Sequence, residues 1–408
     1  MIDQACKKLG LLPPEVPPNC GVITIATDSW MHQLDKFGIM GNCPISHLCL
    51  PGTHDSATAM LTSTLTDTAS PKIRELIDKV QFGAISAACV ALPPLAIKIM
   101  LKTEETVADT TRNLAVATSK RIEDQLKDGV RALDLRVFYD ELDQDFYSVH
   151  SVRGENYNSI LDQLASFLQS HPGEIVYAWI RAMPHLYFDK DKNVLGRFDS
   201  DAVFESFGQL LARKLGKYAV RRSEHPPGSS PFDAGYADLN TRQTGRVILQ
   251  FDKIDAEQNY KLRGEGSEIC YSFAEVSPRH DYDVHPPTSG PYMGWHKWSV
   301  SEAQASNIGQ SDVKNALNHV LRGWYYVPPW VVAPAVAAVL KAVLPDNNCH
   351  FRTMREVAEG RNSQLQDVFA VAVGKEKWIS AFFADFYETS RLIELAVGRS
   401  VVQLSSES

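Results

Sequence analysis

The sequence has no block of basic residues, although 22% of its 408 residues are charged. Lysine and arginine number 41 against 49 aspartates and glutamates, which gives a formal net charge of −8. A protein that binds nucleic acid usually gathers basic side chains on one face, because it must neutralise phosphates. We therefore expect no nucleic-acid partner for this chain.

The cysteines lack the spacing of a metal site or a disulfide framework. There are seven, an odd number, and no two of them are separated by two residues as in a zinc site. Free thiols, mostly buried, in a reducing compartment are the prediction. The first residues, from Met1 to Lys8, lack the apolar stretch of a secretory leader. We expect a cytoplasmic location. Secretion by a route that needs no signal peptide remains an open alternative.

Long uninterrupted hydrophobic runs are also missing. The two most apolar segments, 82–101 and 324–344, each contain a Pro-Pro pair and a lysine, so neither is predicted to span a bilayer. Two interpretations stay open for them: helices packed in the core, or a lipid-facing rim, since tryptophan and tyrosine favour the headgroup level. Segments 221–243 and 276–345 are predicted as loops that form a rim, and a position of this rim at a membrane stays open.

Strand and helix patterns alternate along the chain. Strands are expected at 45–50, 132–138, 146–152, 174–182, 246–252 and 378–385, and helices at 111–128, 157–170, 201–217 and from 390 onward. Strands separated by helices indicate a parallel sheet with covered faces. The sequence thus predicts an α/β protein, a single distorted TIM-type β/α barrel over residues 1–408, with an apolar helical insertion at about 59–110 after the first strand.

Residues whose side chains can take part in catalysis follow the first predicted strand. Pro51 and Gly52 are expected to stop that strand, and His54 and Asp55 come directly after them. A histidine at a strand exit beside a carboxylate is well placed for proton transfer.

A second group lies about a hundred residues later. By strand alternation Asp134 and Arg136 share one face, which would point into a barrel, either as a structural ion pair or for use in chemistry. His150 lies on the following strand, where a hydrogen-bonded core histidine is the alternative. Two histidines and an arginine can supply the base, acid and cation that phosphodiester cleavage needs.

Asp385 ends the last predicted strand. It either caps the helix that follows or orients a histidine.

These motifs together resemble the X domain of phosphatidylinositol-specific phospholipases C, especially the small single-domain forms. The resemblance covers about residues 28–183, with a weaker match near 378–400. It is carried by residues 30–31, 50–56, 128–136, 149–150, 171–176 and 384–386. Pro-Gly-Thr-His-Asp-Ser at 51–56, combined with Asp-Leu-Arg at 134–136 and the spaced histidine, is a specific combination.

The resemblance implies a role for each matching residue. His54 would be the general base that deprotonates the inositol 2-hydroxyl, and Asp385 would hold it. His150, paired with Asp55, would protonate the leaving diacylglycerol oxygen. Arg136 would stabilise charge on the phosphate. The products would be diacylglycerol and an inositol cyclic phosphate.

Further expectations concern substrate, metal and partners. Asp134 would bind the substrate region of the site, where it would hold Arg136 or complete the polar floor of the pocket. Arg181 stands where the bacterial enzymes have a substrate-binding lysine. Because an arginine stands at position 136, the resemblance implies the type that needs no metal, and no cofactor is expected. The expected partner is a membrane surface carrying a phosphatidylinositol-type lipid, with peripheral association and no obligatory protein partner.

Two alternatives remain open. The strand at 246–252 lacks the arginine with which the bacterial enzymes grip inositol. One alternative is a membrane-binding scaffold without turnover. The other is a phosphodiesterase for another phospholipid headgroup.

Overall fold

The structure is a computed structural model. It describes residues 25–63, 115–140, 143–150, 152–182, 200–241, 243–253, 264–276, 294–298 and 379–405, with the single residues 112, 262, 355, 358, 359 and 362.

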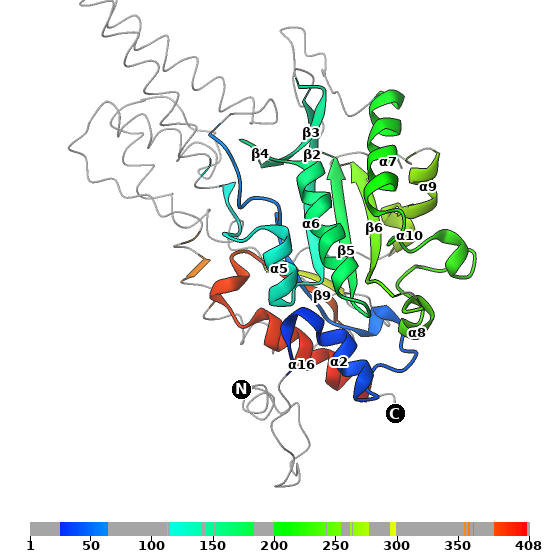
Figure 1. The fold of residues 1–408 in the computed structure, drawn as a ribbon. Coiled ribbons are helices and arrows are strands. Elements are labelled where there is room, and N and C mark those ends of the chain that lie inside the picture. Colours follow the sequence, from blue (N-terminus) through cyan, green and yellow to red (C-terminus); the bar gives the residue numbers. More distant parts are fainter. Residues whose placement is uncertain are drawn as a thin grey trace, which may run out of the picture.

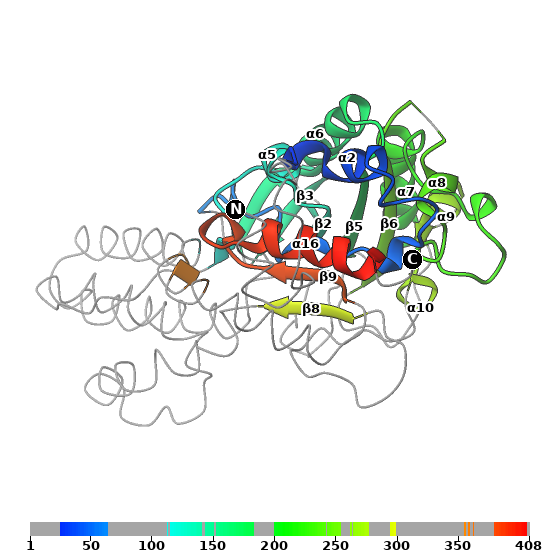
Figure 2. The same ribbon diagram turned by 90° about the horizontal axis from the view of Figure 1, so that it is seen from below.

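One curled, mainly parallel sheet organises these residues (Figures 1 and 2). Its main path runs in the order β7-β6-β5-β2-β1-β9-β8, and all neighbours on that path are parallel. These strands are β1 (Leu50–Thr53), β2 (Ala132–Asp140), β5 (Ile175–Ala182), β6 (Arg246–Lys253), β7 (Cys270–Tyr271), β8 (Gly294–Trp298) and β9 (Ile379–Ala384). Within the described residues no pairing joins β7 to β8, so the sheet is curled but not closed there.

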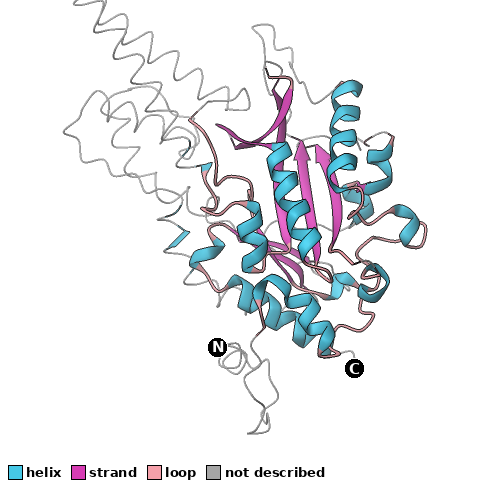
Figure 3. Ribbon diagram, in the orientation of Figure 1, coloured by secondary structure: helices cyan, strands magenta, loops and turns pink. Residues whose placement is uncertain are grey.

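Helices cover the outer face of the sheet and its amino-terminal end (Figure 3). Alternate residues of β2 and β5, such as Leu135 and Ala178, pack against the outer helices, while Tyr177 and Trp179 face inward. The α-helices are α2 (Trp30–Lys36), α5 (Ile122–Asp128), α6 (Tyr157–Ser170), α7 (Asp201–Leu215), α8 (Tyr236–Leu239), α9 (Glu265–Ile269), α10 (Phe273–Val276) and α16 (Leu392–Ser405). The 3-10 turns are η1 (Thr27–Ser29), η2 (Ile45–His47), η3 (Arg222–Glu224) and η4 (Tyr387–Thr389). The predicted α/β class is confirmed.

The first strand lies later in the chain than predicted. Residues 45–47 form η2, where Ile45 and Leu48 both enter the core, a spacing that suits a helical turn. The strand β1 contains Pro51 and Gly52, which were expected to end it. Pro51 needs only its carbonyl here, which accepts a hydrogen bond from the Arg131 N–H at 2.8 Å. A Cβ on Gly52 would lie 2.7 Å from the Phe383 ring, so glycine permits the close approach of β9.

The predicted strand 146–152 is in fact two strands of a hairpin. β3 (Asp145–His150) pairs antiparallel with β2, and β4 (Val152–Asn156) pairs antiparallel with β3. Within the helix predicted at 111–128, α5 covers Ile122–Asp128 and is followed by Gly129 in the left-handed conformation. Of the other described residues in that range, Arg112 and Ala115 are helical and residues 116–121 are not. The helix at 157–170 is confirmed as α6, where Asn156 caps the first turn.

Segment 221–243 is less loop-like than predicted. It contains η3 and α8, and Phe232, Tyr236 and Leu239 are buried. The Tyr236 hydroxyl donates to the Gly173 carbonyl, just before β5, at 2.8 Å. This part of the segment therefore lies at the amino-terminal end of the strands, opposite the end where His54 follows β1.

The described residues cover the other predicted segments only in part. Residues 294–298, inside the predicted loop 276–345, form β8 beside β9. Apart from residues 59–63, the insertion at 59–110 lies outside the described residues, as do segments 82–101 and 324–344. Among the described helices, none combines the length and the apolar character needed to cross a bilayer. Among the described cysteines, Cys49 and Cys270 are buried free thiols, as predicted.

Candidate active site

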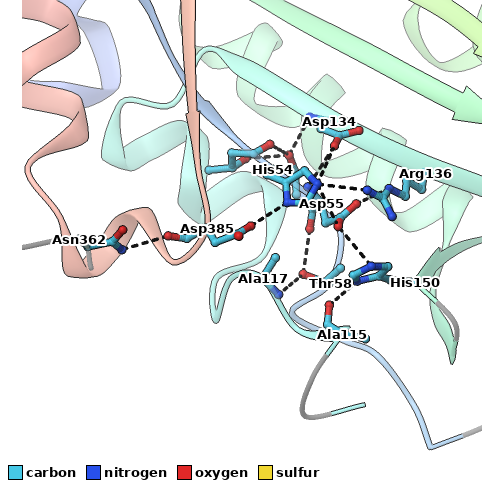
Figure 4. A network of polar contacts seen from close by, with 12 residues as sticks. His54, Asp55, Thr58, Ala115, Ala117, Asp134, Arg136, His150, Asn362 and Asp385 are labelled. Carbon is cyan, nitrogen blue, oxygen red and sulfur yellow. Dashed lines mark hydrogen bonds and ion pairs between the residues drawn. The ribbon is translucent and has the colours of Figure 1, made fainter. Parts of the chain in front are cut away.

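The residues singled out from the sequence converge at the carboxyl ends of neighbouring strands (Figure 4). His54 and Asp55 follow β1, Asp385 follows β9, and His150 ends β3. Asp134 and Arg136 lie on β2, beside Arg181 on β5. Because adjacent parallel strands end at one edge of a sheet, residues far apart in the sequence meet there.

His54 is held between a carboxylate and a guanidinium. Its Nδ1 lies 2.7 Å from Oδ1 of Asp385, and its Nε2 lies 3.1 Å from Nη2 of Arg136. An arginine can only donate, so Nε2 accepts and the proton sits on Nδ1, facing Asp385. His54 is 4% exposed and Asp385 is fully buried. The arrangement leaves Nε2 as the basic atom of a neutral imidazole.

Asp55 connects the two histidines. Its Oδ2 lies 3.3 Å from Nε2 of His54 and 3.4 Å from Nε2 of His150, while Oδ1 forms an ion pair with Nε of Arg136. Its backbone is left-handed, with φ of 46°, which is unusual for a residue with a side chain. Both imidazoles thus face one carboxylate, and a proton gained by either Nε2 would be stabilised by it.

His150 is oriented by the backbone of another segment. Its Nδ1 lies 2.6 Å from the Ala115 carbonyl, so Nδ1 carries a proton and Nε2 faces Asp55. Burial lowers the pKa of His150, the Asp55 carboxylate raises it, and the Arg136 guanidinium lowers it, with a net lowering. The side chain keeps 29% exposure, more than any other member of the group, so His150 is the member most open to solvent.

Asp134 pairs with Arg181, where the sequence left open whether it would hold Arg136 or line the floor of the site. Arg181 donates from Nε to Oδ1 at 2.8 Å and from Nη2 to Oδ2 at 2.6 Å, and stacks over the Trp179 ring at 4.6 Å. Burial raises the pKa of Asp134, but the Arg181 and Arg136 guanidinium groups outweigh it and leave this pKa below its ordinary value. Arg136, two residues along the same strand, is turned toward Asp55 instead.

Three of these residues have the spacing of a metal site. His54, Asp55 and Asp134 each offer a ligand atom, and these atoms lie within 4.8 Å of one another. However, the guanidinium groups of Arg136 and Arg181 contact the same carboxylates. Two fixed positive charges would repel a divalent cation there, so this donor set fits a bound metal poorly.

Several supporting residues were not found from the sequence. Thr58 donates to the Asp55 carbonyl at 2.8 Å, and the Ala117 N–H donates to Thr58 Oγ1 at 2.9 Å. Asn362 donates to the carbonyls of Asp385 and Phe386 at 3.0 and 2.9 Å. Alanines that act through their backbone leave no side-chain signal, and a lone asparagine has no spacing to recognise.

Two described cavities lie away from this group. One of about 340 Å³ is lined by Arg222, Cys270 and Glu275 among others, and one of about 320 Å³ by Lys120, Tyr387 and Arg391 among others. Every polar group named in them takes part in hydrogen bonds or ion pairs within the protein. The chemistry of the side chains, and not cavity size, locates the candidate site.

Comparisons with known proteins agree with the motif analysis. No protein-family model matches the chain as a whole or in part. It is 31% identical over 155 residues to human PI-PLC X domain-containing protein 2, covering 38% of this chain and 43% of that protein. The mouse protein of the same name is 30% identical over 155 residues, covering 38% of each. The predicted resemblance to the X-domain family is confirmed, and the chain matches less than half the length of these relatives.

Solved structures of phospholipases C also align with the chain. The phosphatidylinositol-specific phospholipase C from Listeria monocytogenes is 14% identical, with a TM-score of 0.46, covering 92% of this chain and 99% of that one. The enzyme from Staphylococcus aureus is 13% identical, with a TM-score of 0.45, covering 91% of this chain and 97% of that one.

Proposed function

We propose that this protein is a phosphatidylinositol-type phospholipase C. The observation that carries the proposal is the common contact of two histidines with Asp55: Nε2 of His54 and Nε2 of His150 lie 3.3 and 3.4 Å from the same carboxylate oxygen. An arginine, Arg136, contacts both His54 and Asp55. Similarity to the X-domain proteins over 155 residues supports the same reaction class.

The proposed reaction uses His54 as base. Nε2 of His54 takes the proton from the inositol 2-hydroxyl, and that oxygen attacks the phosphorus. His150 donates a proton from Nε2 to the diacylglycerol oxygen as the phosphorus–oxygen bond to it breaks. The products are diacylglycerol and an inositol 1,2-cyclic phosphate. Because the nucleophile belongs to the substrate, the attack is intramolecular and gains the corresponding entropic advantage.

Arg136 takes the phosphate in this proposal. Its guanidinium now rests against Asp55 and Nε2 of His54, the atom that must meet the hydroxyl. A phosphate oxygen would draw Nη2 away and free Nε2 for the hydroxyl. Charge on the phosphate is then stabilised by a fixed fork of donors, which an ammonium group cannot reproduce. We expect Arg136→Lys to keep the fold and lose most of the activity.

Independence from metal is part of the proposal. Its support is the pair of guanidinium groups that already neutralise Asp55 and Asp134. Activity should therefore persist in excess chelator. Loss of activity in chelator, with recovery on added Ca²⁺ or Mg²⁺, would contradict it.

The headgroup is the part of the proposal with a second candidate, a phosphodiesterase for another phospholipid. β6 has one arginine, Arg246, and it lies at the amino end of the strand. There its guanidinium pairs with Glu224 and donates to the carbonyls of Tyr218, Leu239 and Ala219. Arg246 is therefore not at the end of the sheet where an inositol ring would bind.

One experiment separates the candidates. The protein is incubated in chelator with vesicles that each carry one phospholipid: phosphatidylinositol, its phosphorylated forms, phosphatidylcholine or sphingomyelin. The water-soluble product is identified by ³¹P NMR. A cyclic inositol phosphate supports the proposal, and a different product identifies another headgroup. Vesicle binding without any soluble product in the whole panel would support the scaffold alternative.

A further inference from the structure

Two neighbouring strands end in the same uncommon backbone geometry beside His54. Asp55, after β1, has φ of 46°, and Phe386, after β9 and Asp385, has φ of 44°. In this left-handed region a side chain crowds its own backbone, so a non-glycine residue stays there only when its surroundings hold it. The groups that hold these two turns therefore help to place the candidate catalytic side chains.

Asn362 holds the turn after β9. Its Nδ2 lies 3.0 Å from the Asp385 carbonyl, 2.9 Å from the Phe386 carbonyl and 2.7 Å from Thr389 Oγ1. The side chain is buried, and it reaches the turn from a segment that precedes β9 (Figure 4). Two consecutive carbonyls that converge on one amide nitrogen cannot rotate without breaking a hydrogen bond. The backbone of Asp385 is fixed by these contacts.

The opposite side of the turn is held by Ala117. The Phe386 N–H donates to the Ala117 carbonyl at 2.5 Å, and the Ala117 N–H donates to Thr58 Oγ1 at 2.9 Å. Thr58 Oγ1 donates to the carbonyl of Asp55 at 2.8 Å. A continuous path of hydrogen bonds thus links Asn362 to both left-handed turns, and the turns carry Asp385 and Asp55.

The unused atom of Asn362 indicates which part of the side chain matters. Oδ1 of Asn362 is buried and has no hydrogen-bond partner among the described residues. A buried acceptor without a partner lowers stability, so packing alone would favour an apolar residue here. The amide N–H donors are the part that contributes.

We propose that Asn362 is a positioning residue, whose amide holds the Asp385–Phe386 turn so that the Asp385 carboxylate stays aimed at Nδ1 of His54. The inference rests on the proposed function, in which His54 is the base. Asn362 acts only through Asp385, which lies 2.7 Å from His54. Without the amide, the turn relaxes, the carboxylate moves away, and His54 loses the partner that sets its tautomer and stabilises its protonated form.

The test compares Asn362→Ala with Asn240→Ala. Asn240 also donates through Nδ2, to the Tyr236 hydroxyl at 3.1 Å, but at the amino end of the sheet. The pKa of His54 is measured in each variant by NMR titration of the imidazole resonances. In Asn362→Ala this pKa should fall by about one unit, because an adjacent carboxylate raises the pKa of histidine by that order. In Asn240→Ala it should not change.

The NMR readout needs no substrate, so it remains informative if the protein cleaves no inositol lipid. In that case the proposed function fails, and the His54 titration still decides the positioning role. An unchanged His54 pKa in folded Asn362→Ala overturns the inference. If that variant does not fold, Asn362→Leu replaces it, since leucine is close to asparagine in shape and removes the N–H donors to both carbonyls. The same fall is then expected, and no fall overturns the inference.

Activity supplies the second readout. With the substrate identified, Asn362→Ala should lower kcat/KM by about 10- to 100-fold, the loss typical of a misplaced reacting group. In an Asp385→Asn background the same substitution should cause almost no further loss, because the effect passes through the carboxylate. Equal losses in both backgrounds would show that Asn362 acts on general structure, and would overturn the inference.

Discussion

Two groups of charged residues lie at opposite ends of the same strands, and they are built differently. At the amino end, Arg131 and Glu174 are fully buried and paired at 2.7 Å. Nη1 of Arg131 donates to the carbonyls of Leu126 and Val130 and Nη2 donates to that of Asp28, each at 2.7 Å. Oε1 of Glu174 accepts from the backbone N–H of His32. At the carboxyl end, both oxygens of Asp55 and Nε of Arg136 are buried without a hydrogen bond of regular geometry among the described residues.

The difference separates a structural ion pair from a group that can react. The Arg131–Glu174 pair uses its hydrogen-bonding capacity inside the protein and leaves nothing for a ligand. The Arg136–Asp55 contact is electrostatic and imperfect, and Arg136 and His150 keep 14% and 29% exposure. Charges that are buried but incompletely bonded can exchange their partners for those of a substrate at low cost. Four predictions test this comparison, from the largest expected effect to the smallest.

The largest effect is expected for His54→Asn. An asparagine amide can still donate to Asp385 in place of Nδ1, but Nε2 is lost. Turnover should fall by about 10²- to 10⁴-fold, as for the loss of a general base. The midpoint of thermal unfolding should stay close to that of the wild type, measured by circular dichroism. Turnover within a factor of three of the wild type would contradict the role of His54.

Arg131→Met should have the largest effect on stability. It leaves Glu174 buried without its cation, so the free energy of unfolding should fall by about 3–5 kcal/mol, measured by urea titration. Activity per folded molecule should change little, because the substitution lies at the far end of the sheet. A strong loss of activity with unchanged stability would contradict the purely structural role assigned to the Arg131–Glu174 pair.

Arg136→Met is the matched substitution in the candidate site: Arg136 lies on β2, whereas Arg131 directly precedes that strand. Here we expect the reverse result: activity falls by about 10²-fold or more from the loss of phosphate stabilisation. The free energy of unfolding should change by less than for Arg131→Met, since Arg136 is partly exposed and Asp55 keeps both histidines as neighbours. Urea titration and lipid cleavage of the two variants, measured side by side, give the comparison directly. Equal destabilisation by both would contradict it.

The smallest effect is the pH dependence set by His150. A general acid must be protonated, and the pKa of His150 is lowered mainly by burial. In the free enzyme kcat/KM should therefore fall as pH rises, with a midpoint below the ordinary histidine value of about 6.5. For stability the sign is opposite: folding favours neutral His150, so its contribution is complete above about pH 6.5 and is lost as pH falls toward the lowered value. A His150→Gln variant should lose both this fall of kcat/KM with rising pH and this fall of the free energy of unfolding with falling pH.

Parts of the fold that follow from local pattern were predicted well. The helical stripe at 157–170 is α6, and the strands at 132–138, 174–182 and 246–252 agree with β2, β5 and β6 within two residues at each end. The errors fall where tertiary contacts override local signals. Pro51 and Gly52 continue β1 because β2 and β9 pair with it on both sides. The predicted strand 146–152 is divided into β3, which ends at His150, and β4, which begins at Val152, because β4 turns back to pair with β3.

For the candidate site, the sequence by itself determined which groups are candidates for the chemistry: two histidines, an arginine and carboxylates near strand ends, whose side-chain chemistry is visible in the residue type. Only the tertiary structure decided which of them touch. Asp385 meets His54 across 331 residues, Asp134 accepts two hydrogen bonds from Arg181 on the neighbouring strand, and His150 is oriented by the carbonyl of Ala115. Strand periodicity assigns a residue to a face, but hydrogen-bond partners depend on which strands lie side by side. Backbone groups and a lone asparagine carry no local pattern, so their part in the site emerges only when the chain is folded.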